Sequence, residues 1–383
     1  MEFEAATSAE AACGIPIIDI SPWTSSPVGS EPSSAQMRVA QSWDAAFREY
    51  GCAVVVGHGI AEAAFEQLNT EAREFFGLSL KVKQQYNHGK YGHPAGGYTA
   101  PGNEIVALSC AEDGAGGSAS PKFDPVENFV FTSAPAQYAS PSGSPAPIQS
   151  ADAYYAAMNA TLRTIHAISS TALGVDVDFF CQFYDAVEGS EKGANGNALR
   201  LAHYPAIDTI QAKASEQYDT QVRYGAHTDY QTYTILRPDK SDWHTGRVAG
   251  KSVRCGGLEV FHRSGSWVQV MIPQHLNALV VNAGDLFQRW TNDRWHSPLH
   301  RVVTQRMDTG ADTGAEGKAE AEAGEVVSIP SLPRQSIVFF TGPLEDCTIE
   351  VLDLPGEPKQ GPKYPPIRSG DHLLMKLNRT NDT

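Results

Sequence analysis

Short β-rich runs dominate the second half of the chain, and they limit the possible fold more than any other feature of the sequence. Between residues 198 and 341, runs rich in Val, Ile, Thr, Tyr and Phe are separated by Gly, Asn and Asp. Closely spaced short strands of this kind predict a β-sandwich or a jelly roll. The expected strands cover residues 198–204, 225–236, 258–262, 267–271, 278–282, 300–303 and 336–340.

The first half mixes helical and β patterns. Apolar residues recur at helical spacing in four segments, whereas β patterns are expected at 52–56 and 127–131. Residues 1–14 are expected to form a disordered leader. Segments 238–254 and 308–325 look inserted between strands, and the second is a low-complexity stretch expected to be a disordered surface loop. The expected helices cover residues 34–50, 61–76, 80–86 and 151–173.

Composition narrows the range of partners. The 383 residues carry a formal net charge of −15, which argues against nucleic acid or an anionic membrane as a partner. The six cysteines are scattered without a Cys-x-x-Cys pair, as expected of free thiols in a reducing compartment. The first residues lack the basic start of a secretory signal, and the apolar runs are too short to span a bilayer. We therefore expect a cytoplasmic protein, and we also expect it to be a monomer, whereas the net charge says nothing about the substrate.

One motif in the β-rich half suggests a metal site. His227 and Asp229 are two residues apart in a run that favours strand, so their side chains would share one face. They would supply two of the three ligands of the facial triad that binds non-haem Fe(II). A chain with 12 histidines contains roughly one His-x-Asp by chance, so a third ligand is needed. His296 and His300 are both candidates, and His300 is favoured because it begins an expected strand.

Two histidines and a carboxylate suit Fe(II), although manganese or zinc could occupy the same ligands. An iron of this type leaves positions for O2 and for a chelating 2-oxo acid, which a cation must hold. Arg334 and Ser336 provide that pattern at the start of an apolar strand, where they would face the same way. The guanidinium can grip a carboxylate with two hydrogen bonds while the hydroxyl donates a third.

With these residues in place, the chain resembles the Fe(II)/2-oxoglutarate-dependent dioxygenases of the isopenicillin N synthase-like superfamily. The resemblance covers most of the chain, and its pieces are specific as an ordered set. They comprise residues 15–21, 47–52, 57–60, 201–205, 227–229, 256–260, 282–285, 291–302 and 333–336.

The resemblance implies a distorted double-stranded β-helix, a form of jelly roll, with N-terminal helices packed outside. It implies that His227, Asp229 and His300 bind iron, and that Arg334 and Ser336 bind the distal carboxylate of 2-oxoglutarate. Tyr204 would help to hold the other end of the cosubstrate, although Ala202 stands where many relatives carry Asn. The expected division is an N-terminal region at 15–150, the core with its preceding helix at 151–345 and a C-terminal extension at 346–383.

The implied activity is oxidation of a C–H bond in a small, specialised-metabolite substrate, with release of succinate and CO2. Hydroxylation, desaturation, demethylation and oxidative ring closure all remain open. So do an iron oxidase of the isopenicillin N synthase type that uses no 2-oxoglutarate and a non-catalytic metal-binding barrel. The candidate walls of the substrate pocket are Tyr98, Phe131, Tyr230, Gln231, Tyr233 and Phe340.

Overall fold

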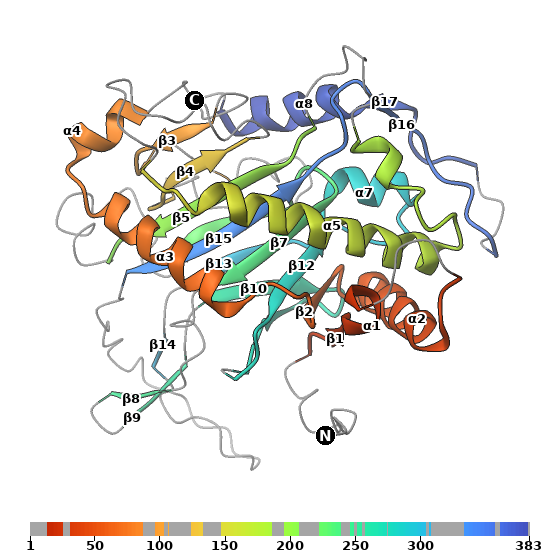
Figure 1. Cartoon of the computed structure of the whole chain (residues 1–383), viewed down its shortest axis with the longest axis horizontal. Helices are drawn as coiled ribbons and strands as arrows, with labels where there is room; N and C mark the ends of the chain where they lie inside the picture. The colour runs from red at the N-terminus through yellow and green to blue at the C-terminus, as the bar shows by residue number, and fades with distance from the viewer. Residues whose placement is uncertain are drawn as a thin grey trace, which may run out of the picture.

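A computed structural model gives the structure of the chain, in which helices pack against the largest β-sheet (Figure 1). No helix in the described part of the chain combines the length and the apolar character needed to cross a membrane. The described residues are 14–25, 31–86, 96–102, 106, 124–132, 147–185, 195–206, 222–238, 246–248, 251–254, 257–273, 275–303, 306–307, 333–356 and 361–381.

The larger sheet, here the major sheet, has eight strands in the order β1-β2-β12-β7-β15-β5-β4-β3. Its neighbouring strands are antiparallel except for the parallel pair β1 and β2. In that order the strands are Ile17–Asp19, Cys52–Val56, Leu279–Ala283, Tyr233–Pro238, Arg334–Thr341, Ala198–Tyr204, Glu127–Phe131 and Gly97–Thr99.

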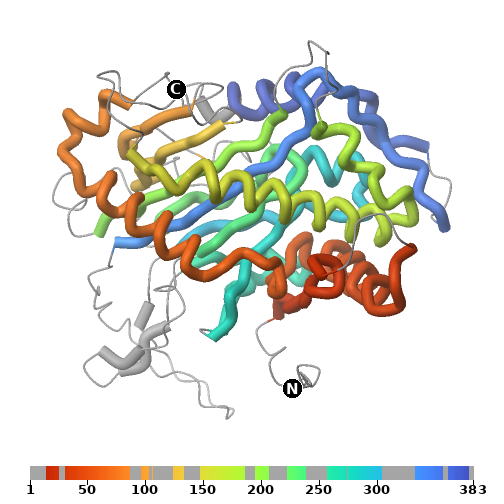
Figure 2. The backbone as a smooth tube through the Cα atoms, in the orientation of Figure 1, coloured from red at the N-terminus to blue at the C-terminus, as the bar shows by residue number. Residues whose placement is uncertain are grey.

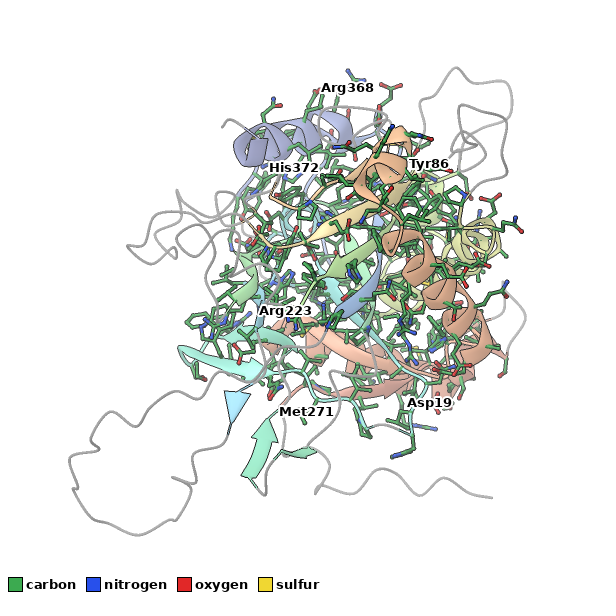
Figure 3. The ribbon with its side chains drawn as sticks, turned by 90° about the vertical axis from the view of Figure 1, so that its left-hand side faces the viewer. Asp19, Tyr86, Arg223, Met271, Arg368 and His372 are labelled. Atoms are coloured by element: carbon green, nitrogen blue, oxygen red, sulfur yellow. The ribbon has the colours of Figure 1, made fainter. Side chains whose placement is uncertain are left out.

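The minor sheet has four strands in the order β11-β10-β13-β6, which are Ser266–Gln269, Gly257–His262, His300–Val303 and Val222–His227. One apolar cluster joins the two sheets, with Val54, Leu236 and Val280 from the major sheet against Leu258 and Val260 from β10. Seen from the side in Figure 3, the minor sheet, the major sheet and the helices form successive layers. Short strands β8 (Gly246–Val248), β9 (Lys251–Arg254) and β14 (Arg306–Met307) form a separate three-stranded sheet.

The helices cover the other face of the major sheet. Helix α3 (Glu62–Phe76) and helix α5 (Ala151–Leu173) run across it, while α2 (Ser34–Glu49) lies beside β1 and β2 (Figures 1 and 2). The large shared core includes Phe47, Phe75 and Ile165 from the helices and Leu199 and Phe339 from the sheet. Full burial of one such side chain contributes about 1.5–3 kcal/mol, so this face anchors the helices.

Local sequence explains where α2 begins and ends. Ser33 and Gln36 form a reciprocal capping box at its start, and Val39, Trp43 and Phe47 supply a buried apolar stripe. The turn after the helix places Gly51 at φ +68°, in the left-handed region that favours glycine. A Cβ at this position would lie 2.3 Å from the carbonyl oxygen of His296, so no other residue fits without rearrangement.

The shorter elements complete the N-terminal and C-terminal parts. Helix α1 (Ser21–Thr24) precedes α2, and α4 (Leu80–Lys83) continues into the 3-10 turn η2 (Gln84–Tyr86). The 3-10 turn η5 (Cys181–Phe183) follows α5, and α7 (Asp285–Trp290) follows β12. The C-terminal part consists of β16 (Thr348–Ile349), β17 (Ile367–Arg368) and α8 (Ser369–Asn381). Lys376 of α8 forms an ion pair with Asp285 at 2.6 Å, which ties the last helix to the start of α7.

The prediction of a mainly β jelly roll with flanking helices is confirmed. The expected helices at 34–50, 61–76 and 151–173 agree with α2, α3 and α5 to within one residue at each end. The expected helix at 80–86 splits into α4 and η2. Residues 1–13 of the expected leader at 1–14 and the whole low-complexity segment at 308–325 lie outside the described residues, whereas the segment at 238–254 contributes β8 and β9.

Candidate active site

The three predicted metal ligands meet between the two sheets. His227 ends β6, His300 begins β13, and the two residues pair directly across the strands. The Nε2 atom of His227 lies 3.6 Å from Asp229 Oδ1, and that of His300 lies 3.7 Å from Asp229 Oδ2. All three side chains are buried, and their ligand atoms lie within 4.8 Å of one another. In the described part of the chain, this is the group of His, Cys, Asp and Glu side chains that could hold a metal ion.

Backbone carbonyls orient both imidazoles. His227 Nδ1 lies 2.8 Å from the Gly225 oxygen, and His300 Nδ1 lies 2.9 Å from the Pro298 oxygen. Each Nδ1 must carry the proton in order to donate to a carbonyl, so each Nε2 keeps its lone pair directed at the centre of the triad. Burial and the neighbouring His227 also lower the pKa of His300, which keeps its imidazole neutral.

Asp229 is held by a turn, which corrects the expectation of one continuous strand at 225–236. Strand β6 stops at His227 and β7 starts at Tyr233. The backbone N–H of Asp285 donates to the backbone carbonyl oxygen of Asp229 at 2.8 Å. The backbone N–H of Leu286 donates to the backbone carbonyl oxygen of Gln231 at 3.0 Å. These N–H groups belong to the first turn of α7 and have no acceptor within the helix. They bond to the carbonyl groups of the 229–232 turn, and this stabilises the turn between β6 and β7.

The Asp229 carboxylate remains ionised although it is buried. Burial alone would raise its pKa, but the adjacent His300 and His227 hold the pKa well below the ordinary range. Asn282 of β12 donates from Nδ2 to Asp229 Oδ2 at 2.6 Å and fixes the carboxylate from behind. Two imidazole nitrogens and one carboxylate fit a divalent cation such as Fe(II) and leave coordination positions open.

His296, the rival third ligand, lies away from the triad. Its Nδ1 contacts Arg263 Nη2 at 3.1 Å on the exposed side of the minor sheet. Burial lowers the pKa of His296 to about 4, so it is neutral near pH 7. The preference for the strand residue His300 over the loop residue His296 therefore agrees with the geometry.

Arg334 and Ser336 lie on the face of β15 that looks between the sheets. Antiparallel pairing places Arg334 opposite Tyr204 and Ser336 opposite Ala202 on β5. Arg334 is 3% exposed and its guanidinium lies over the Tyr204 ring at 4.9 Å, whereas the buried Ser336 Oγ has no hydrogen-bond partner among the described residues. A carboxylate bound at Arg334 would give that hydroxyl an acceptor, so this end of the barrel suits the cosubstrate.

Aromatic rings connect this end to the triad. The Tyr204 ring contacts that of Tyr224 edge-on at 6.4 Å, and Tyr224 in turn contacts the His227 ring at 4.9 Å. A chain of ring contacts therefore links the Arg334 end of the barrel to the metal ligand His227.

Three of the predicted wall residues belong to the helix-side core instead. Tyr98, Phe131 and Tyr233 are each 1% exposed and pack in the cluster beneath the helices. The Tyr98 hydroxyl donates to Glu127 at 2.6 Å, and the Tyr233 hydroxyl lies 2.7 Å from that of Ser169. Their strands alternate as expected, but these side chains point to the face opposite the triad.

The other three wall candidates differ in their placement. Phe340 is half-buried on the same face of β15 as Arg334, and Tyr230 is half-buried in the turn after Asp229. Gln231 is 8% exposed, and its amide packs against Gly342, where an added Cβ would lie 1.3 Å from Gln231 Oε1. Phe340 and Tyr230 thus stay candidates, while Gln231 fills space at the end of β15.

Sequence reasoning did not single out Arg200, Asn128 and Tyr224, which also line this region. Arg200 Nε donates to Asn128 Oδ1 at 2.7 Å, and Arg200 Nη1 donates to the Tyr224 hydroxyl at 3.2 Å. A charged residue inside the alternating run 198–204 was the available signal.

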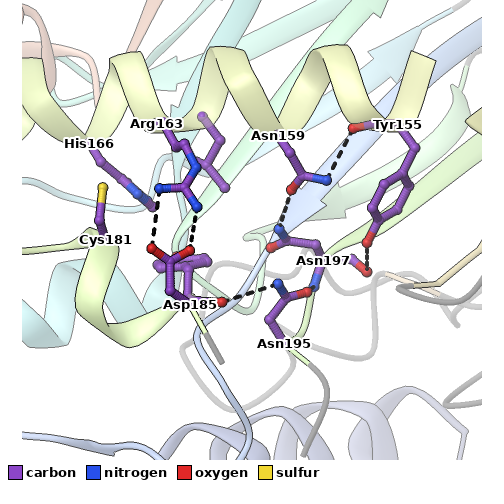
Figure 4. Close-up of a pocket in the computed structure, with 10 residues that line it drawn as sticks. Tyr155, Asn159, Arg163, His166, Cys181, Asp185, Asn195 and Asn197 are labelled. Atoms are coloured by element: carbon purple, nitrogen blue, oxygen red, sulfur yellow. Dashed lines mark hydrogen bonds and ion pairs between the residues drawn. The ribbon is translucent and has the colours of Figure 1, made fainter. Parts of the chain in front are cut away.

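A second concave region lies beyond the major sheet, between α5 and the segment after it (Figure 4). Its volume is about 240 Å³, and the Arg163–Asp185 ion pair spans it at 2.5 Å. The Tyr184 hydroxyl, at its inner wall, bonds to Thr232 in the turn that carries Asp229. The lining residues are Tyr155, Asn159, Leu162, Arg163, His166, Cys181, Tyr184, Asp185, Asn195 and Asn197.

Comparison with known proteins places the chain among oxygenases. Residues 15–137 match the family model described as non-haem dioxygenase in morphine synthesis N-terminal, and residues 196–343 match that of the 2OG-Fe(II) oxygenase superfamily. The homoarginine-6-hydroxylase of Oryza sativa subsp. japonica is 28% identical over 95% of this chain and 96% of its own length. The validamycin A dioxygenase of Streptomyces hygroscopicus subsp. limoneus is 24% identical over 94% of this chain and 85% of its own length.

Solved structures agree with these matches. The full-length T7H of Neurospora crassa, in complex with alpha-KG, superposes with a TM-score of 0.65 and 25% identity, over 95% of each chain. Both halves of the sequence, the barrel and the His-Asp-His triad thus lead to the same group. The chain belongs to the 2OG-Fe(II) oxygenase superfamily and is a 2-oxoglutarate-dependent dioxygenase.

Proposed function

We propose that His227, Asp229 and His300 bind Fe(II), and that Arg334, Ser336 and Tyr204 bind 2-oxoglutarate, for oxidation of a small molecule. The observation that carries the proposal is the pair of convergent sites, a buried triad of ligand atoms within 4.8 Å and a buried Arg-Ser pair on one strand face. When bound, iron with 2-oxoglutarate and O2 supplies the oxidising power, and succinate and CO2 leave as products.

The residues of the chain contribute position and charge. The guanidinium of Arg334 offers two parallel N–H donors to the distal carboxylate, and the Ser336 hydroxyl adds another. Both side chains are buried, so this charged contact is screened less than it would be in water. The Nδ1–carbonyl contacts of His227 and His300 keep both Nε2 atoms aimed inward before any ligand arrives.

The substrate class follows from relatives and from charge. Homoarginine-6-hydroxylase and validamycin A dioxygenase are named for small molecules, which supports a small-molecule substrate, and the first of these names favours hydroxylation as the outcome. The net charge of −15 argues against nucleic acid as a partner, so we propose none.

We infer that the protein is a cytoplasmic monomer with an N-terminal region, a core and a C-terminal extension. Cys52, Cys181 and Cys347 are free thiols, in keeping with a reducing compartment. The two family matches, which end at 137 and begin at 196, support a division near residue 150. Light scattering of the purified protein tests the monomer, because a dimer would double the measured mass.

The test of the metal site is an anaerobic titration of the apo-protein with Fe(II) and 2-oxoglutarate. The visible charge-transfer band of the chelate should appear for the wild type and disappear for His227→Ala and His300→Ala. His296→Ala is the matched control, because it removes the rival histidine outside the triad and should keep the band. A wild type without the band would favour a non-catalytic metal-binding barrel.

The use of 2-oxoglutarate is tested by product analysis. Succinate formed per O2 consumed should be close to one during substrate turnover. Substrate oxidation without succinate would instead assign an iron oxidase of the isopenicillin N synthase type, in which the Arg334 pair would hold the carboxylate of the substrate.

A further inference from the structure

A second arginine lies between the sheets, on the same strand face as the proposed cosubstrate site. Arg200, Ala202 and Tyr204 alternate along β5, and pairing places Val338 of β15 opposite Arg200. Arg200 is therefore four residues from Tyr204, about 13 Å along the strand. The two guanidiniums of Arg334 and Arg200 are thus set apart along one wall.

Contacts with both sheets hold Arg200 in place. Its Nε donates to Oδ1 of Asn128, a fully buried residue of β4, at 2.7 Å. Its Nη1 donates to the Tyr224 hydroxyl of β6 at 3.2 Å, and the guanidinium carbon lies 5.3 Å from the centre of that ring. Because β4 and β5 belong to the major sheet and β6 to the minor sheet, the half-buried Arg200 side chain links the two sheets.

This position lies next to the proposed metal. The Tyr224 ring that supports Arg200 also contacts the ring of His227 at 4.9 Å. One aromatic ring therefore separates a fixed cationic group from a metal ligand. A group bound at Arg200 would therefore lie one aromatic ring away from a proposed metal ligand.

The chemistry of the cluster selects for hydrogen-bond acceptors. Arginine offers only donors, and the carbonyl oxygen of Asn128 accepts one of them. Val130 and Val338, the strand neighbours of Arg200, are half-buried and apolar. A planar acceptor group on an otherwise apolar body matches this surface.

We propose that Arg200 recognises the substrate through a planar acceptor group, either a carboxylate or an amide carbonyl, and that Asn128 and Tyr224 hold the Arg200 side chain in position beside the metal site. This inference rests on the proposed function, since it needs the metal at His227. Arg200 is here a specificity-determining residue and takes no part in cosubstrate binding.

The test compares the wild type with Arg200→Met and Arg200→Lys, each loaded anaerobically with Fe(II) and 2-oxoglutarate. A thermal-shift screen uses three matched groups of small compounds, namely carboxylates, the corresponding primary amides, and analogues that carry neither group. Carboxylates or amides should raise the melting temperature of the wild type, and the group that does so identifies the acceptor. Titration of a hit should show roughly 10- to 100-fold weaker binding to Arg200→Met, with an intermediate loss for the charged but non-planar Arg200→Lys.

Two controls separate this inference from the proposed function. The chelate band and the affinity for 2-oxoglutarate should be unchanged in Arg200→Met, which also shows that the variant folds. Arg163→Met, which removes an arginine from the far side of the major sheet, should bind every hit as the wild type does. The inference is overturned if hits occur only among compounds with neither group, if no compound binds, if Arg200→Met binds hits normally, or if its affinity for 2-oxoglutarate falls. A wild type that lacks the chelate band would overturn the proposed function itself.

Discussion

Replacing Asn282 by Leu should weaken metal binding without touching a metal ligand. The Asn282 amide donates to Asp229 Oδ2 at 2.6 Å, and both side chains are buried. A hydrogen bond to a charged group contributes about 1.5–3 kcal/mol, and each 1.4 kcal/mol corresponds to a factor of ten. Leucine has a similar size but no donor, so the affinity for Fe(II) should fall by about 10- to 100-fold, the range typical of lost partners of metal ligands.

Anaerobic Fe(II) titration in the presence of 2-oxoglutarate measures this loss through the chelate band. Asn277→Leu is the matched control, because it removes an asparagine donor that binds the Ile60 carbonyl at 2.8 Å, away from the triad. Urea unfolding of both metal-free variants corrects for any general loss of stability. Equal Fe(II) affinity in Asn282→Leu and Asn277→Leu would refute the view that Asn282 tunes the site through Asp229.

Three further changes test other parts of the structure. Arg334→Lys should raise the dissociation constant of 2-oxoglutarate by about 10- to 100-fold, because lysine loses the paired N–H geometry; an unchanged constant in calorimetry would exclude Arg334 from the cosubstrate site. Asp44→Asn should lower the free energy of unfolding at pH 7 by about 2 kcal/mol. Burial would raise the Asp44 pKa, but hydrogen bonds from Arg294 and Trp295 lower it, so this stability is present above about pH 4 and is lost as pH falls towards the folded-state pKa. Urea curves across pH should therefore converge in acid, and a constant gap would contradict the reasoning. Gly284→Ala should cost about 1–3 kcal/mol in urea, because its Cβ would lie 2.5 Å from the Gln231 backbone oxygen, whereas Gly361→Ala meets nothing within 4 Å and should cost little.

The parts of the site that sequence could predict are those encoded by alternation within one strand. Arg334 and Ser336 share a face because they are two residues apart on β15, and His300 starts a strand as its apolar neighbours suggest. Alternation within residues 127–131 also places Phe129 and Phe131 on one side of β4, where both pack in the large core. It cannot say which side faces the triad, because that depends on where the helices pack.

Other features depend on distant residues that no local pattern reveals. The turn that carries Asp229 is set by N–H groups of Asp285 and Leu286, more than fifty positions further along the chain. From its local sequence, Arg200 is only a charged residue within a strand. Its contacts with Asn128 and Tyr224 depend on the packing of β4 and β6 beside it. Helices were simpler to predict, since the capping box and apolar spacing of α2 are local.

Both faces of strand β15 carry side chains that the protein needs, and this limits which insertions and deletions the strand can tolerate. Arg334 and Ser336 project into the barrel, while Ile337 and Phe339 fill the core under the helices. Inserting or deleting one residue early in this strand would exchange the two sets, so the cosubstrate grip and the core would fail together. Changes in length are therefore expected to be tolerated in the connections between strands, such as the long segments 238–254 and 308–325, and not within β15.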